Sequence, residues 1–151
     1  MPPMPDASPA ARGVIAPLLE ANPLRLVIAN RTAERARELA QRFAAKGHVE
    51  AAALGDIPEE DFDLVLNATS TSTHGEALVL PDHALRAGAL AYDMAYGPGA
   101  APFLSFARAR GMRASDGLGM LVEQAAESFS LWRGKRPDTA EILARLRSRA
   151  A

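Results

Sequence analysis

The stretch LRLVIANRTAERARELAQRF, residues 24–43, decides the fold. Residues 24–29 are apolar except for Arg25 and show no polar alternation, which is typical of a strand buried on both faces of a parallel sheet. Thr32 follows as a helix N-cap, and Glu34 lies in the first turn, where an acid suits the helix dipole. Apolar residues then recur with helical spacing at Ala36, Leu39, Ala40 and Phe43. We therefore expect a buried strand that leads directly into a helix packed on the sheet.

The same alternation continues along the chain. Further strands are expected at 49–54, 62–66, 90–94 and 112–114, and further helices at 8–20, 81–87, 103–110 and 117–132. A last helix begins in a capping box made by Asp138 and Glu141, and we expect it to turn Ile142, Leu143 and Leu146 inward. Strands that alternate with helices predict an α/β fold, a doubly wound parallel sheet with flanking helices.

The composition fits one globular domain. The chain has 151 residues, of which 48% are hydrophobic and 23% charged, enough for one core but not for two full domains. A formal net charge of -1 gives no global field that would attract nucleic acid or an anionic membrane, and no apolar run is long enough for a membrane span. The N-terminal MPPMPDASPA lacks the basic and apolar regions of a secretory signal. We expect neither nucleic acid nor a membrane as a partner.

Neither the cysteine count nor the acidic and histidine residues indicate a metal centre. The absence of cysteine excludes disulfides, zinc–cysteine sites and thiol catalysis, and it agrees with a cytoplasmic location. The three histidines are far apart in the sequence. The acids of residues 59–63 are better interpreted as a solvated turn than as a metal cluster, because no histidine stands near them at ligand spacing.

Four strand-to-helix junctions form the candidate site, because ligands of open α/β sheets bind outside the carboxyl ends of the strands. These junctions are residues 30–35, 67–73, 94–96 and 116–119, and all four are rich in small or polar residues. For the last three, the simpler interpretations are a polar loop, a half-buried tyrosine and a turn before a helix. The functional interpretation is contact with a cofactor, and their shared edge favours it.

The first junction indicates which dinucleotide would bind. NAD-binding folds carry an acid after the second strand that binds the adenosine ribose, but here Asn30 and Arg31 stand in that place. Arg31 and Arg35 can pair with a 2′-phosphate, and the capped start of the helix adds free N–H groups. This chemistry selects NADP over NAD. Taken alone, the stretch is more simply a helix cap beside two surface arginines.

Four motifs in this order resemble the C-terminal NADP-binding domain of the shikimate dehydrogenase family. They are ANRTAERARELA (29–40), DLVLNATS (63–70), YDMAYGPGAAPF (92–103) and DGLGMLVEQAAESFSLW (116–132), and the similarity covers residues 10–147. Glutamyl-tRNA reductase also has an NRT-type turn, but it is not expected to carry the last two motifs together. The family reduces 3-dehydroshikimate to shikimate with NADPH, on the pathway to chorismate and the aromatic amino acids.

The resemblance implies a role for individual residues. The adenosine 2′-phosphate of NADP would be held by Asn30, Arg31, Thr32 and Arg35. The path of the cofactor across the sheet edge would be lined by Thr69, Ser70 and Thr71, with Met94 packing near the nicotinamide and Gly117 contacting it. The shikimate side of the cleft would be reached by Tyr96 and Gln124.

The chain departs from the family pattern at its beginning. The family has a separate substrate domain with a catalytic lysine and aspartate, then a first strand and a loop like GAGGAARGV. Here Asp6, Ser8 and Pro9 replace three of the loop's glycines. We therefore expect an irregular segment at 1–9, a Rossmann-type NADP-binding domain at 10–151 with its first strand and glycine-rich loop missing or degenerate, and no catalytic residue in this chain.

Two expectations about behaviour follow from these departures. The isolated chain should be inactive, and its unpaired strand edges should cause self-association or pairing with a substrate domain. The alternative is a non-catalytic module that binds a nucleotide or another protein. The altered glycine loop is the feature that separates these two interpretations.

Overall fold

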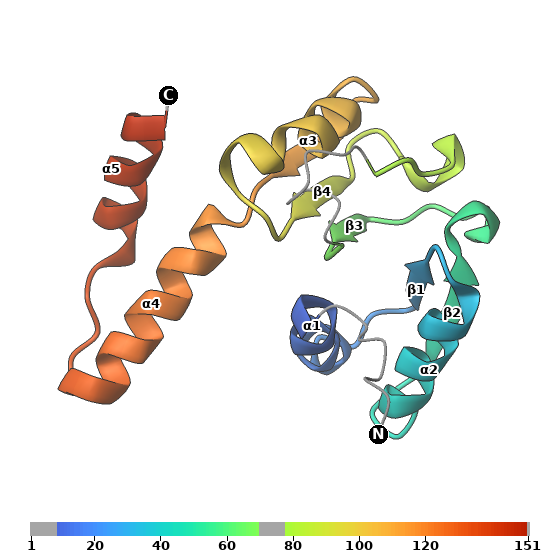
Figure 1. Cartoon of the computed structure of the whole chain (residues 1–151), viewed down its shortest axis with the longest axis horizontal. Helices are drawn as coiled ribbons and strands as arrows, with labels where there is room; N and C mark the ends of the chain where they lie inside the picture. Colours follow the sequence, from blue (N-terminus) through green and yellow to red (C-terminus); the bar gives the residue numbers. More distant parts are fainter. Residues whose placement is uncertain (1–8, 70–77, 151) are drawn as a thin grey trace.

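The computed structural model describes residues 9–69 and 78–150, and helices alternate with strands over most of that length (Figure 1). In order, the elements are α1 (Pro9–Glu20), β1 (Leu26–Asn30), α2 (Ala33–Phe43), β2 (Val49–Ala53), β3 (Leu64–Asn67), β4 (Leu90–Asp93), α3 (Ala101–Arg108), β5 (Arg113–Ser115), α4 (Leu118–Arg133) and α5 (Thr139–Ala150). The predicted α/β class is confirmed. The helix expected at 81–87 is instead a three-residue 3₁₀-helix, Asp82–Ala84, because the backbone leaves the helical region at Leu85.

The strands form two parallel sheets. In one, β1 pairs with β2, with Asn30 opposite Ala53. In the other, β3, β4 and β5 follow one another, with Asn67 opposite Asp93. The order of a doubly wound sheet, 3-2-1-4-5-6, assigns β2 and β1 to positions 3 and 2, and β3, β4 and β5 to positions 4, 5 and 6. Among the described residues, no strand pairs with β1 or β3 at position 1. The expected loss of the first strand concerns residues 1–9, of which 1–8 lie outside the described residues.

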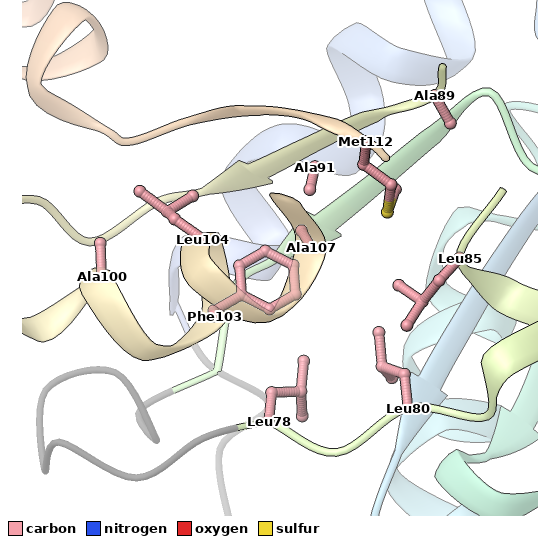
Figure 2. Close-up of a cluster of buried hydrophobic side chains, with 10 residues drawn as sticks. All are labelled: Leu78, Leu80, Leu85, Ala89, Ala91, Ala100, Phe103, Leu104, Ala107 and Met112. Carbon is pink, nitrogen blue, oxygen red and sulfur yellow. The ribbon is translucent and has the colours of Figure 1, made fainter. Parts of the chain in front are cut away.

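The larger core lies between α3 and the three-stranded sheet (Figure 2). Phe103 is 1% exposed and, with the neighbouring side chains of α3, packs against the strands. The buried members of this cluster are Leu78, Leu80, Leu85, Ala89, Ala91, Ala100, Phe103, Leu104, Ala107 and Met112. A smaller cluster joins α1 to α2 and β1 through Ile15, Leu19 and Leu39. Each sheet therefore has its own apolar support, and the polar strand ends are left to form a site.

Helices α4 and α5 extend away from the sheets as a pair (Figure 1). Of the three apolar residues of α5 expected inside, Leu143 is half-buried, while Ile142 and Leu146 are exposed, so the expectation that all three face inward was wrong for two of them. The reason is that α5 packs mainly on α4, which covers one side of it. In the described part of the chain, no helix combines the length and the apolar character needed to cross a bilayer.

Candidate functional site

The junction between β1 and α2 forms one end of the site. Asn30 ends β1, and its Oδ1 accepts a hydrogen bond from the N–H of Thr32 at 3.0 Å. Thr32 occupies the N-cap position with extended backbone, but its own side chain makes no capping bond. The turn into α2 is therefore fixed by the side chain of Asn30, two residues earlier than the sequence predicted.

Two cations lie at this helix start. Arg31 and Arg35 are exposed, and neither forms an ion pair with any residue in 9–69 or 78–150. The acid in the first turn, Glu34, pairs with Arg37 instead, at 3.2 Å. Guanidinium groups beside the free N–H groups of a helix N-terminus can bind a phosphate. The residues present thus fit the 2′-phosphate end of NADP.

A buried polar pair joins the ends of β3 and β4. Asn67 and Asp93 are 1% and 0% exposed, and the Asn67 Nδ2 donates to Asp93 Oδ2 at 3.1 Å. Asn67 Oδ1 accepts from both the N–H and the hydroxyl of Thr69, at 3.0 and 2.7 Å. Asp93 Oδ1 accepts from the N–H of Ala95 at 2.9 Å. The pair therefore fixes the first residues of both loops.

Sequence reasoning did not single out Asp93, and it included Asn67 only as the first residue of the candidate junction 67–73. The signal was present as a polar residue at the end of each of two apolar strands, DLVLN and LAYD. Its meaning depends on the register, which places Asn67 opposite Asp93. That register cannot be read from either strand alone.

The start of α4 closes against the loop after β4. The N–H of Gly117 donates to the carbonyl of Ala95 at 2.8 Å, and a Cβ at Gly117 would lie 2.2 Å from the carbonyl oxygen of Met94. Met94 and Gly117, which the resemblance places around the nicotinamide, are therefore brought together. The loop backbone after β4 is the reason why residue 117 has no side chain.

Asp116 links this corner to α5. Its Oδ1 accepts from the N–H of Leu118 at 3.2 Å and lies 3.4 Å from Nη2 of Arg147. Burial raises the pKa of the Tyr92 hydroxyl, and the nearby Asp116 carboxylate raises it further. The last helix is thus tied to the loop that carries Gly117.

The remaining predicted site residues, on the substrate side and along the path of the cofactor, are less closely connected to the rest of the site. Tyr96 is 52% exposed in the loop after β4, Gln124 is exposed on α4, and no hydrogen bond between described residues joins them. Thr69 lies in the loop after β3, bonded to Asn67, while Ser70 and Thr71 fall outside the described residues.

Acidic residues near position 60 form ion pairs with arginines. Glu60 pairs with Arg25, and Asp63 pairs with Arg86 at 2.8 Å. Within the described residues, no group of three or more metal-ligating side chains comes together. The interpretation of this segment as a turn rather than a metal cluster agrees with these ion pairs.

Two cations follow one strand of the parallel sheets, and small residues follow others. This pattern at the carboxyl ends of the strands is typical of a Rossmann-type dinucleotide-binding domain. The family model for shikimate / quinate 5-dehydrogenase matches residues 7–84, and the model for the shikimate 5′-dehydrogenase C-terminal domain matches residues 117–147. The chain belongs to the shikimate dehydrogenase family, an oxidoreductase family, as the resemblance predicted.

Individual relatives agree with this assignment. The protein named shikimate dehydrogenase (NADP(+)) from Nitrosospira multiformis is 54% identical over 143 residues, which are 94% of this chain and 52% of the relative. The solved Ael1 enzyme from Pseudomonas putida is 44% identical with a TM-score of 0.81, covering 90% of this chain and 50% of its own. Shikimate 5-dehydrogenase from Thermus thermophilus, solved with NADP(H) and shikimate, is 30% identical with a TM-score of 0.69, covering 91% and 50%. The chain spans about half the length of the curated relatives it matches.

Proposed function

We propose that this chain is the NADP-binding part of a shikimate dehydrogenase, an enzyme that reduces 3-dehydroshikimate to shikimate with NADPH. The observation that carries this proposal is the pair Arg31 and Arg35, exposed and without an ion pair among the described residues, at the start of α2. Asn30 precedes them where an NAD-selective domain carries an acid. Relatives named for NADP(+) support the same cofactor.

The proposed roles divide the residues between the two ends of the cofactor, within a single domain at 10–151. The 2′-phosphate is bound by Asn30, Arg31, Thr32 and Arg35. The path of the cofactor is lined by Thr69, Ser70 and Thr71, and the nicotinamide lies against Met94 and Gly117. The contact between the Met94 loop and Gly117 supports this second group. Tyr96 and Gln124 are proposed to face the substrate.

When bound, NADPH supplies the hydride for reduction of the ketone. The residues of this chain bind the adenosine phosphate, orient the nicotinamide and keep the two loops fixed. The resemblance assigns the catalytic lysine and aspartate to the family's substrate domain and no catalytic residue to this chain, so we propose that the chain alone has no dehydrogenase activity. Shikimate-dependent reduction of NADP by the pure chain would contradict this. The cytoplasmic location stays a prediction.

Titration with NADPH and with NADH tests the cofactor assignment. We expect NADPH to bind more tightly, and Arg31→Ala to weaken NADPH by about 10- to 100-fold while leaving NADH unchanged, the range expected for a charge-assisted hydrogen bond. Arg37→Ala is the matched control, because Arg37 lies on the same helix but pairs with Glu34. Equal affinities for the two cofactors, or no binding of either, would overturn the proposal.

One observation favours a second candidate, a non-catalytic interaction module. Helix α1 begins at Pro9, which has no N–H to offer a pyrophosphate. If neither cofactor binds, this module becomes the better interpretation.

We also propose that the chain associates with itself or with a substrate domain. The support is that β1 and β3 border the position that holds the first strand of a doubly wound sheet, and neither pairs there with any described residue.

A further inference from the structure

We propose that Asn67 and Asp93 are positioning residues that hold the nicotinamide end of the site in one geometry. This inference rests on the proposed function, because the loops that they fix carry Thr69 and Met94. Neither side chain is accessible to a ligand, since both are almost completely buried. They therefore act through the backbone and through Thr69 rather than by touching the cofactor.

A chain of hydrogen bonds crosses three junctions. It begins at Thr69, passes through Asn67 and Asp93 to the N–H of Ala95, and continues from the carbonyl of Ala95 to the N–H of Gly117. The loop after β3, the loop after β4 and the start of α4 are thus connected through the buried side chains of Asn67 and Asp93 and the backbone of Ala95. Buried networks of this kind hold their members rigidly when every group is satisfied.

The chemistry of Asp93 sets the direction of this network. Both carboxylate oxygens of Asp93 accept hydrogen bonds, so Asn67 turns its amide NH₂ toward Asp93. That orientation leaves Asn67 Oδ1 facing Thr69, where it accepts two bonds. Asp93 therefore determines the position of Thr69, although the two residues belong to different loops.

An isosteric substitution exposes this dependence. In Asp93→Asn, one arrangement sets two amide NH₂ groups against each other, and the bond between β3 and β4 is lost. If the Asn67 amide flips to restore that bond, its NH₂ faces the N–H and hydroxyl of Thr69. The double variant Asn67→Asp/Asp93→Asn exchanges donor and acceptor, and it can restore the hydrogen bonds described above between the two side chains, to Thr69 and to Ala95.

The test compares two ligands by calorimetric titration of the full chain. NADPH reaches both ends of the site, whereas adenosine 2′,5′-bisphosphate reaches only the end at Arg31 and Arg35. We expect Asp93→Asn to raise the Kd of NADPH about tenfold, as for loss of a hydrogen bond, with the Kd of adenosine 2′,5′-bisphosphate unchanged. The double variant should recover most of the NADPH affinity.

A matched control separates positioning from general destabilisation. Phe103→Leu weakens the core of the same sheet without touching the network, so it should lower the melting temperature and leave both Kd values unchanged. A measurement on the wild-type chain covers the case in which Asp93→Asn does not fold. The NMR signals of the Asn67 side-chain amide and the Ala95 N–H should shift with NADPH but not with adenosine 2′,5′-bisphosphate.

The outcomes distinguish this inference from the proposed function. If the wild-type chain binds neither ligand, the proposed function fails. If it binds both but Asp93→Asn leaves the NADPH affinity unchanged, weakens both ligands equally, or is not rescued by the double variant, the positioning role is wrong. The role is also wrong if wild-type NADPH binds no more tightly than adenosine 2′,5′-bisphosphate, or if the Asn67 and Ala95 signals do not respond to NADPH.

Discussion

At the scale of the residue, Gly117 is a position where the backbone leaves no room for a side chain. A Cβ there would lie 2.2 Å from the carbonyl oxygen and 2.7 Å from the carbonyl carbon of Met94. Both are backbone atoms, so relief requires the loop to move. We expect Gly117→Ala to lower the free energy of unfolding by about 1–3 kcal/mol, measured by urea denaturation, and to weaken NADPH binding.

Gly119 provides the control for this prediction. A Cβ at Gly119 meets only Leu143 Cδ2, at 3.8 Å, which is an ordinary contact. Because Gly119 lies in the first turn of α4, Gly119→Ala should be neutral or stabilise the chain by up to about 1 kcal/mol. A loss as large as that of Gly117→Ala would show that the approach of Met94 is not the cause.

How far the site can be read from single residues differs between its two ends. The adenosine end could be proposed from the sequence, because Asn30, Arg31 and Arg35 are consecutive or one turn apart and stand where an NAD-selective domain carries an acid. The nicotinamide end could not, because Asp93 acquires its role only through burial and through its partner on another strand. Chemistry that depends on local spacing is visible in a sequence, whereas chemistry that depends on register is not.

At the scale of the element, an ion pair at the beginning of the first sheet ties β2 to the residue that precedes β1. Arg25 Nε lies 2.7 Å and Nη2 2.5 Å from the two carboxylate oxygens of Glu50. The hydrogen bonds from Arg25 hold the pKa of Glu50 below its ordinary value of 4.5. Since the folded chain favours the charged form, this stabilisation is complete above the unfolded pKa and disappears as the pH falls through the lower folded value.

The prediction is that Glu50→Gln makes stability less sensitive to acid. The variant should be less stable than the wild type in urea at neutral pH, and the difference should shrink as the pH falls below 4.5. His48 Nε2 also lies 3.3 Å from Glu50 Oε1. Glu60→Gln is the control, because Glu60 pairs with the same arginine, Arg25. Glu60 is more exposed, and its removal should matter less. An undiminished difference at low pH would contradict the assignment.

The helices and strands were largely predictable where an apolar run in the sequence lies next to helix-capping or turn residues. Helix α2 and strands β1 and β2 lie within two residues of the expected bounds, because their periodicity and turn residues agree. Helix α5 was located correctly, but its exposed side was not anticipated, because the number of neighbours around a helix is a tertiary property. Its apolar residues are consistent with either burial or exposure.

At the scale of the whole molecule, the described residues form two parallel sheets where the doubly wound order has one. The sequence predicts unpaired strand edges at this place, since residues 1–9 offer prolines in place of a strand and the downstream motifs are intact. The relation between the sheets follows from the strand order rather than from any contact that the sequence reveals. Position 1 of the doubly wound order, between β1 and β3, is therefore the place where association is expected.

This arrangement predicts that the molecule associates through its strand edges. An edge strand presents unpaired N–H and C=O groups, and Leu26–Asn30 of β1 carries the apolar sequence LVIAN beside them. We expect the average mass in sedimentation experiments to rise between micromolar and near-millimolar concentration. Amides of β1 and β3 should become protected from hydrogen exchange over the same range, because pairing occupies them.

Leu64→Lys, at the start of β3 where the side chain is 39% exposed, should suppress the rise in average mass through charge repulsion at the edge. Ala109→Lys adds the same charge at an exposed site beyond α3 and should not. A chain that stays monomeric throughout, or that responds equally to both lysines, would show that the open strand edges do not drive association.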